Sequence, residues 1–171
     1  MEEIREVQNL LNKEATLQKI RRIAYQIYEN NFKEKRLVLA GINGEGYKLA
    51  ELIKGYLNEI SDNEVIIAKI HLDKKADYQP DIKIECEIET FKKQTVILVD
   101  DVLNTGRTLA YSLRPFLSIP LKKLQVAVLV NRDYLHFPIK ADYVGYRLST
   151  TLTDHVKVTL SDADELGVYL F

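Results

Sequence analysis

The segment 96–108, which reads VILVDDVLNTGRT, constrains the fold of this chain more than any other part of it. Its four leading aliphatic residues are typical of a strand that is buried on both faces of a parallel sheet. Two adjacent carboxylates follow, Asp100 and Asp101, and a short polar turn then leads into a predicted helix over 107–117. Because ligands of open α/β sheets bind beyond the carboxyl ends of the strands, this turn is a candidate binding site.

The residue types in the turn favour a phosphate group. Backbone N–H groups from Leu103 to Thr108 are expected to converge at the start of the helix, where the helix dipole favours an anion. Gly106 allows the backbone to approach that anion closely. The hydroxyl groups of Thr105 and Thr108 add further hydrogen-bond donors.

The two aspartates need a different partner, because carboxylates repel phosphate. Asp100 and Asp101 match the 2- and 3-hydroxyls of a ribose, with Mg2+ close by. The alternative is an ordinary strand-to-helix turn in which Asp and Thr cap the helix. Capping explains one acid and one threonine, but it leaves the second carboxylate and the rest of the turn without a role.

The remaining apolar patterns predict one α/β domain over 1–171, with a mostly parallel central sheet flanked by helices. Period-two alternation over 82–88 predicts an exposed strand that forms a hairpin with its neighbour, after a polar loop over 71–80. The other predicted helices cover 14–32 and 46–60, and the other predicted strands cover 37–40, 65–68, 124–130, 143–148 and 156–160.

Composition excludes several classes of protein. The 24 basic and 25 acidic residues give a net charge of -1, without the basic excess of a non-specific nucleic-acid binder. The single cysteine, Cys86, excludes an internal disulfide framework, and the three histidines have no metal-ligand spacing. The start Met1–Arg5 is unlike a secretory signal, and no apolar run approaches the ~20 residues that cross a bilayer, so we expect a cytoplasmic protein.

Segment 96–108 resembles the phosphoribosyl pyrophosphate motif of type I phosphoribosyltransferases. The resemblance is strongest to the PyrR branch, the pyrimidine operon attenuators and uracil phosphoribosyltransferases, and it extends from about Leu17 to Phe171. It also rests on the segments 41–46, 127–132 and 138–145. The resemblance implies a β-hairpin flap, a small C-terminal hood, Mg2+ as cofactor and commonly a homodimer.

The resemblance also assigns roles to residues. It implies that Asp100 and Asp101 hold the ribose, and Mg2+ indirectly through the ribose or water. The turn residues Leu103, Thr105, Gly106, Arg107 and Thr108 would hold the 5-phosphate. The pyrophosphate would lie over Asn43, Gly44 and Glu45, and the flap would contain Lys74 and Lys75. Arg132 would contact the base. The alternative for Arg132 is a surface arginine paired with Asp133 or Asp142.

Several positions depart from the family pattern. PyrR members usually carry Lys-Thr-Arg where this chain has Asn43, Gly44 and Glu45. The replacement of a cation by Glu45 should weaken pyrophosphate binding, because like charges repel. The exception would be a Glu45 side chain that faces solvent or helps to hold Mg2+. The flap arginine is absent. Histidines associated with RNA binding are replaced by Tyr25 and Tyr134, which argues against RNA as a partner.

Three functions remain open at this point. The first is transfer of phosphoribosyl from phosphoribosyl pyrophosphate to a nucleobase, and the neutral Asn104 favours uracil because purine-using members often carry Asp there. The second is a nucleotide-sensing regulator of the PyrR kind with weak or no turnover, which Glu45 favours. The third is a purine or xanthine transferase.

Overall fold

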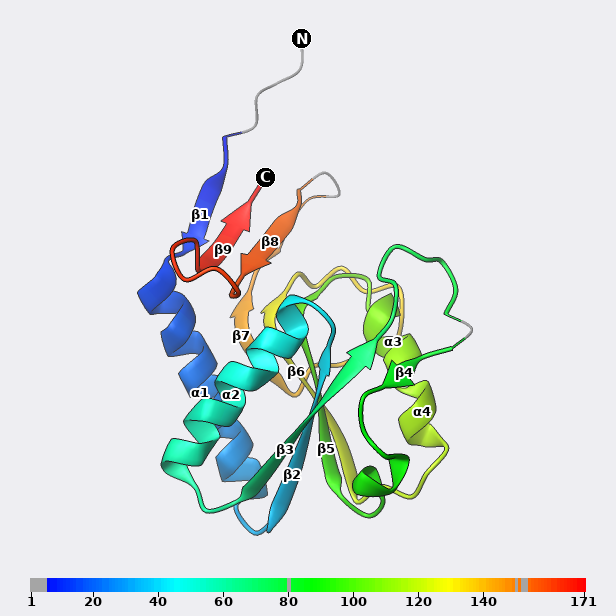
Figure 1. The fold of residues 1–171 in the computed structure, drawn as a ribbon. Helices are drawn as coiled ribbons and strands as arrows, with labels where there is room; N and C mark the ends of the chain where they lie inside the picture. Colours follow the sequence, from blue (N-terminus) through cyan, green and yellow to red (C-terminus); the bar gives the residue numbers. More distant parts are fainter. Residues whose placement is uncertain (1–5, 80, 150, 152–153) are drawn as a thin grey trace.

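The central sheet contains six strands in the order β4-β3-β2-β5-β6-β7 (Figure 1). The computed structural model describes residues 6–79, 81–149, 151 and 154–171. All neighbouring strands of this sheet are parallel except β3 and β4, which confirms the predicted mostly parallel sheet. The strands are β2 (Arg36–Ile42), β3 (Glu64–His71), β4 (Lys83–Ile84), β5 (Thr95–Leu103), β6 (Lys123–Asn131) and β7 (Tyr143–Arg147).

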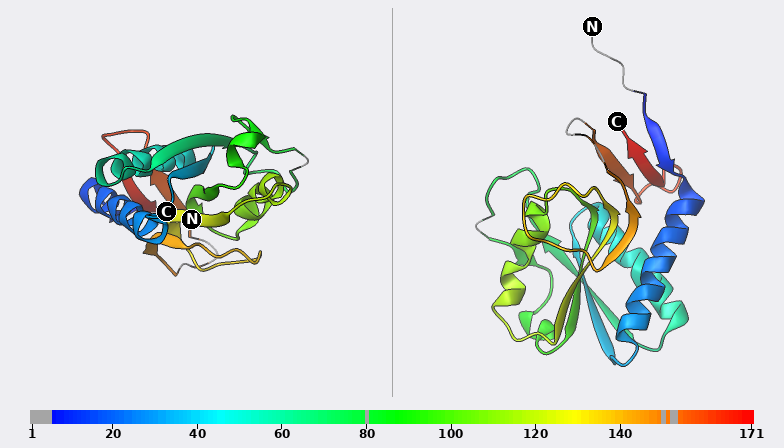
Figure 2. Two further views of the ribbon diagram at one scale, coloured as in Figure 1. Left: turned by 90° about the horizontal axis from the view of Figure 1, so that it is seen from below. Right: turned by 180° about the vertical axis from the view of Figure 1, so that it is seen from behind.

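Helices cover both faces of the sheet, α1 (Lys13–Asn31) and α2 (Glu45–Ile60) on one side and α3 (Arg107–Ser112) and α4 (Arg114–Leu117) on the other (Figure 2). Side chains of β5 alternate between the two faces. Ile97 and Val99 pack in the cluster that contains α1 and α2, whereas Val96 and Leu98 pack with α3 and α4. All four are fully buried, which explains why this strand has a continuous apolar run rather than an alternating one.

The predicted helix over 107–117 is wrong as a single helix. It is divided into α3 and α4, and Leu113 lies between them. Pro115 accounts for the break, because proline has no backbone N–H and its ring clashes with the carbonyl four residues earlier in an uninterrupted helix.

The predicted strand over 82–88 is much shorter than expected. Only β4 pairs with β3, antiparallel, with Ile84 opposite Ile70, and a 3-10 helix (Ile88–Phe91) follows. The hairpin therefore exists, but its apolar residues Ile82, Ile84 and Cys86 pack on the α3 and α4 side of the sheet instead of projecting from it. The connection between β3 and β4 is irregular where it is described, and Pro80 lies outside the described residues.

A second sheet forms the hood, in the order β1 (Gln8–Leu11), β9 (Gly167–Leu170) and β8 (Val156–Thr159), with both pairs antiparallel. Figure 1 shows this sheet above the carboxyl ends of the central strands. Its buried residues Val156, Val158 and Val168 join the core cluster of α1 and α2. β8 confirms the predicted strand over 156–160, whereas β1 and β9 had no counterpart among the predicted strands. Among the described helices, none has the length and apolar character that a bilayer crossing requires.

Candidate active site

The two aspartates lie inside the carboxyl end of β5, which continues to Leu103 rather than ending at Val99 as the sequence suggested. Asp100 is 2% exposed and accepts a hydrogen bond from the backbone N–H of Asp101 at 2.9 Å. The side chain of Asp101 is 17% exposed. One carboxylate is therefore enclosed by protein, and the other reaches solvent.

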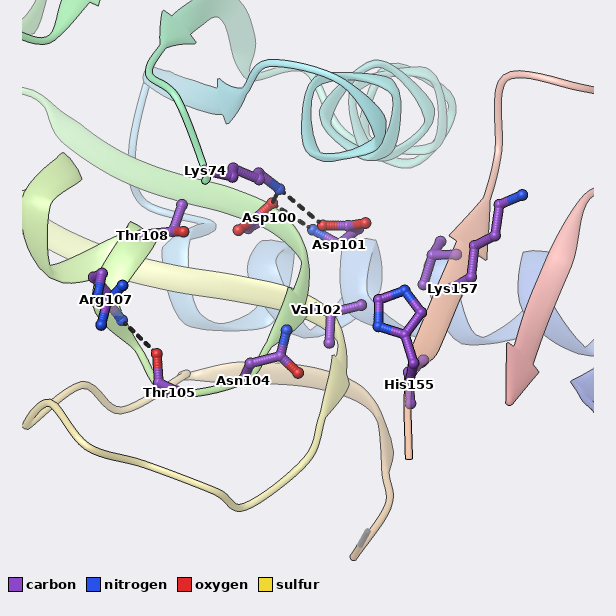
Figure 3. Close-up of a pocket in the computed structure, with 12 residues that line it drawn as sticks. Lys74, Asp100, Asp101, Val102, Asn104, Thr105, Arg107, Thr108, His155 and Lys157 are labelled. Atoms are coloured by element: carbon purple, nitrogen blue, oxygen red, sulfur yellow. Dashed lines mark hydrogen bonds and ion pairs between the residues drawn. The ribbon is translucent and has the colours of Figure 1, made fainter. Parts of the chain in front are cut away.

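Lys74, in the loop after β3, crosses to both carboxylates (Figure 3). Its ammonium lies 2.7 Å from Asp100 Oδ1 and 3.2 Å from Asp101 Oδ1. Burial lowers the pKa of Lys74, but attraction by Asp100 and then Asp101 outweighs burial, so the pKa is raised and the ammonium stays charged. Burial and then repulsion by Asp101 raise the pKa of Asp100 to about 8, while Lys74 pulls it down. The loop after β3 and the end of β5 thus form a site in which one buried carboxyl group keeps its proton well above the usual pH range of an aspartate.

The turn after β5 surrounds a small hollow of about 40 Å3. Gly106 has a φ of 86°, a conformation that favours glycine, and immediately precedes α3. The carbonyl of Thr105 accepts hydrogen bonds from the backbone N–H groups of His136 and Phe137, at 2.8 and 3.0 Å. Because that carbonyl is held from outside the turn, the turn has a defined shape around the hollow.

A larger cavity of about 440 Å3 lies between the end of β5 and the hood. Its walls include Lys74, both aspartates, Asn104 and β8 residues of the hood, and Figure 3 shows His155 of the hood near Val102 of β5. The predicted turn residues that line it are Thr105, Arg107 and Thr108. The carboxylates, the turn and the hood therefore share one cavity.

Arg132 contacts Asn104, which is one of the residues that line this cavity. Arg132 Nη1 donates to Asn104 Oδ1 at 2.9 Å, and Nη2 donates to the carbonyls of Asp154 and Thr151 at 2.9 and 3.3 Å. The carboxylates of Asp133 and Asp142 have other partners, Arg147 and the backbone N–H of Val126. Arg132 thus joins the turn to the segment that leads into the hood, rather than pairing with either aspartate.

The segment 41–46 lies beside the carboxylates but turns its side chains elsewhere. Asn43 Oδ1 accepts a hydrogen bond from the backbone N–H of Leu72 at 3.2 Å, and Gly44 has a φ of 87°. Glu45 faces the hood, where its carboxylate accepts hydrogen bonds from Leu160 and Ser161. None of the three lines the large cavity.

Lys75 does not share the contacts of Lys74, the other lysine of the loop after β3. Its backbone N–H donates to Asp73 Oδ1 at 2.9 Å, and its side chain is not part of the cavity wall. Arg107 reaches the flap instead, with Nη1 3.2 Å from the carboxylate of Asp77. The flap loop is therefore tied to the site by Lys74 on one side and by Arg107 on the other.

Comparison with known proteins shows the family of this chain. The profile of the phosphoribosyl transferase domain family matches residues 6–162. The chain belongs to the phosphoribosyltransferase family. This phosphoribosyltransferase is 32% identical to the bifunctional protein PyrR of Bacillus pumilus, over 91% of this chain and 92% of the relative. It is 36% identical to the bifunctional protein PyrR of Streptococcus thermophilus, over 85% of each chain.

A solved structure shows the same fold in a more distant protein. The hypoxanthine phosphoribosyltransferase of Trypanosoma cruzi superposes with a TM-score of 0.76 over 95% of each chain, at 18% sequence identity. The fold of this phosphoribosyltransferase is accordingly the type I fold, a mostly parallel sheet with flanking helices, as the resemblance implied.

Sequence reasoning missed the hood side of the site in this phosphoribosyltransferase. His155 and Lys157 line the cavity, and the exposed ring of His155 lies 6.4 Å from that of Phe171. No motif marks these positions. The alternation of 156–160 indicated a strand, but only the placement of the hood over β5 turns one face of that strand toward the carboxylates.

Proposed function

We propose that this phosphoribosyltransferase transfers the phosphoribosyl group of phosphoribosyl pyrophosphate to a nucleobase, with uracil as the preferred base, and releases pyrophosphate. A nitrogen of the base forms the new bond to the anomeric carbon while the bond from that carbon to pyrophosphate breaks. The observation that supports this most strongly is the cavity shared by two carboxylates, a glycine turn and the hood.

In this proposal the turn Leu103–Thr108 binds the 5-phosphate. Residues of the turn, Arg107 and Thr108 among them, line a hollow of about 40 Å3, and the proposal has their amide groups and the Thr108 hydroxyl donate to the phosphate there. Asp100 and Asp101 then accept hydrogen bonds from the ribose hydroxyls. Such hydrogen bonds, worth about 1.5–3 kcal/mol each where the carboxylate is charged, would fix the orientation of the sugar.

The donor set also fits Mg2+. Mg2+ prefers oxygen ligands, keeps several waters and binds through one or two carboxylates together with substrate phosphates. Asp100 and Asp101 supply two carboxylates, and no group of three or more possible metal ligands occurs among the described residues, which favours a metal carried by the substrate. When bound, Mg2+ would neutralise the charge that develops on the departing pyrophosphate.

Lys74 takes part by moving in this proposal. Its ammonium occupies carboxylate oxygens that ribose hydroxyls and Mg2+ would need, at 2.7 Å from Asp100. Substrate binding would therefore release Lys74 from the carboxylates and make its charge available to pyrophosphate oxygens. Asn43 and Gly44 would contribute their backbone to the pyrophosphate side, and the more distant Lys75 would add only long-range attraction.

The choice of uracil rests on two observations. Asn104 is a neutral amide that accepts a hydrogen bond from Arg132 at 2.9 Å, so it cannot accept a proton as a carboxylate would. In this proposal Arg132 contacts the base. The curated relatives at 32–36% identity are named bifunctional protein PyrR. Hypoxanthine remains the alternative base, because solved structures with this fold include hypoxanthine phosphoribosyltransferases.

The second candidate function is a nucleotide-sensing regulator with weak or no turnover. The loop 41–46 lacks a cation, and Lys74 closes on the carboxylates, which are features of a protein that could bind nucleotide without efficient transfer. Tyr25 and Tyr134 stand where the family carries histidines associated with RNA binding, so we do not expect tight RNA binding.

Pyrophosphate release tests the enzyme directly. Protein, Mg2+ and phosphoribosyl pyrophosphate are mixed with uracil, hypoxanthine, guanine, xanthine or orotate, and pyrophosphate is measured by a coupled assay. We expect release with uracil, and the double variant Asp100→Asn/Asp101→Asn should abolish it. Absence of release with every base would favour the regulator. A binding assay with pyrimidine leader RNA would then test whether RNA is its partner. Size-exclusion chromatography would test the expected homodimer.

A further inference from the structure

One carboxylate links the start of α2 to the hood. Glu45 Oε2 accepts hydrogen bonds from the backbone N–H groups of Leu160 at 2.6 Å and Ser161 at 3.1 Å. Its other oxygen, Oε1, accepts one from the hydroxyl of Ser161 at 2.7 Å. Both oxygens of Glu45 are therefore engaged by a segment more than a hundred residues away in the sequence.

Glu45 is also well placed for its own helix. It is the first residue of α2, and an acidic side chain in the first turn of a helix interacts favourably with the helix dipole. A carboxylate that is held by three donors and directed to the hood does not face the cavity, and Glu45 is absent from the cavity wall. The negative charge of Glu45, which was expected to repel pyrophosphate, is therefore directed at hydrogen-bond donors of the hood.

We infer that Glu45 is a positioning residue that fastens the loop 41–46 to the hood and thereby sets the width of the active-site cavity. The inference rests on the proposed function, because it gives that loop the pyrophosphate side of the cavity. Both carboxylate oxygens of Glu45 accept hydrogen bonds from the hood, so the side chain acts between these two parts of the protein and not on the substrate.

The three hydrogen bonds of Glu45 to Leu160 and Ser161, called the tether below, are connected through neighbouring residues to two opposite walls of the cavity. One wall is the end of β5 and the other is β8. Gly46, the next residue, lies so close to Asp100 that a Cβ at this position would be 2.8 Å from its Oδ1. Leu160 directly follows β8, the strand that lines the opposite wall with His155 and Lys157. A change in the distance between these walls moves the substrate-binding groups relative to one another, and a misplacement of about 1 Å can cost about 100-fold in rate.

The tether and a simple charge effect predict opposite results for one substitution. If the charge of Glu45 mattered most, Glu45→Lys would place a cation near the pyrophosphate and strengthen the binding of phosphoribosyl pyrophosphate. If the tether matters most, Glu45→Lys breaks three hydrogen bonds and weakens it. Glu45→Gln separates the two effects further, because its amide oxygen can accept from both backbone N–H groups while its NH2 donates to the Ser161 hydroxyl.

Calorimetry of the full chain with Mg2+ and phosphoribosyl pyrophosphate is the test, with ribose 5-phosphate as the second ligand. We expect Glu45→Ala and Glu45→Lys to bind phosphoribosyl pyrophosphate at least tenfold more weakly than the parent, and Glu45→Gln within about threefold of it. Binding of ribose 5-phosphate, which lacks pyrophosphate, should change less than twofold in all three. A general loss of structure would weaken both ligands alike.

Ser161→Ala tests the tether from the other side, and Glu51→Ala is the matched control. Ser161→Ala removes one of three hydrogen bonds and should weaken binding two- to fivefold, with no further loss when it is added to Glu45→Ala. Glu51 lies on the same helix, half-exposed and paired with Lys48 at 3.5 Å, and its loss should have no effect.

Two results overturn the inference. The first is equal or tighter binding of phosphoribosyl pyrophosphate by Glu45→Lys while the parent binds it normally, which leaves the proposed function intact. The second is a parent protein that does not bind phosphoribosyl pyrophosphate, which removes the proposed function as well. Turnover is not needed for either measurement, so a protein that binds without transfer still tests Glu45.

Discussion

Gly46→Ala is expected to damage the site through a single added methyl group. A Cβ at Gly46 would lie 2.8 Å from Asp100 Oδ1, and 3.1 Å from both Asp100 Cα and the carbonyl oxygen of Val99. Two of these three contacts are backbone atoms of β5. A side-chain rotation of Asp100 therefore cannot relieve the overlap, and either the start of α2 or the end of β5 must move.

The size of the movement follows from these distances. Ordinary contacts begin near 3.4 Å, so the groups must separate by about 0.6 Å at the carboxylate and about 0.3 Å at the backbone. Overpacking of this kind typically costs about 1–3 kcal/mol of folding stability. Because Asp100 is one of the groups displaced, we also expect a loss of roughly 10- to 100-fold in transfer rate.

Gly55→Ala provides a matched control on the same helix. Gly55 lies in the interior of α2, and nothing lies within 4 Å of a Cβ built there. Alanine should therefore stabilise the helix by about 0.5–1 kcal/mol through its lower backbone entropy in the unfolded chain. Urea denaturation gives the two stabilities, and pyrophosphate release gives the two rates.

The comparison has a clear contrary result. If Gly46→Ala is as stable as Gly55→Ala and keeps the parent rate, then α2 does not pack on the carboxylates as closely as described. A stable but slow Gly46→Ala would instead support the contact and assign its main cost to the position of Asp100.

Three further predictions concern charge and the base side of the cavity. The pKa of Asp100 is raised from 3.8 to about 8 in the folded state, so the folded protein keeps a proton that the unfolded chain releases. Stability to urea should therefore fall as pH rises from about 4 to about 8. Asp100→Asn should flatten this pH dependence. Lys74→Met should lower the free energy of unfolding by about 1 kcal/mol at pH 9 and by less at pH 5, a modest value because the Lys74 side chain is 37% exposed. The control Lys75→Met should be as stable as the parent at both pH values. Arg132→Ala should raise the KM for the base several-fold and leave the KM for phosphoribosyl pyrophosphate unchanged in steady-state kinetics; equal changes in both would contradict its place on the base side.

The sequence predicted the elements that the hydrophobic pattern determines. The buried run before Asp100 predicted a buried strand of a parallel sheet, and β5 pairs in parallel with both β2 and β6. The turn with Gly106 predicted a strand-to-helix junction, where the structure has a residue of positive φ. These features depend on local sequence and on burial, which a single chain displays directly.

Long-range placement was harder to predict. β1 and β9 are only four residues each, and they pair across nearly the whole chain, so neither has an alternation long enough to recognise. The direction of Glu45 depends on where residues 160–161 lie, and the reach of Lys74 depends on the path of an irregular loop. The sequence therefore located the strand with its two carboxylates and the turn before α3, but not the groups that face them from other elements.

The central claim is that the turn after β5 holds a sugar phosphate while Asp100 and Asp101 hold its ring. A crystal structure of the protein with uridine 5-monophosphate measures this most directly. We predict the phosphate within hydrogen-bond distance of the amides of Leu103–Thr108, the ribose hydroxyls on the two carboxylates, and Lys74 displaced from Asp100. A nucleotide bound elsewhere, with the turn vacant and Lys74 still on the carboxylates, would contradict the account.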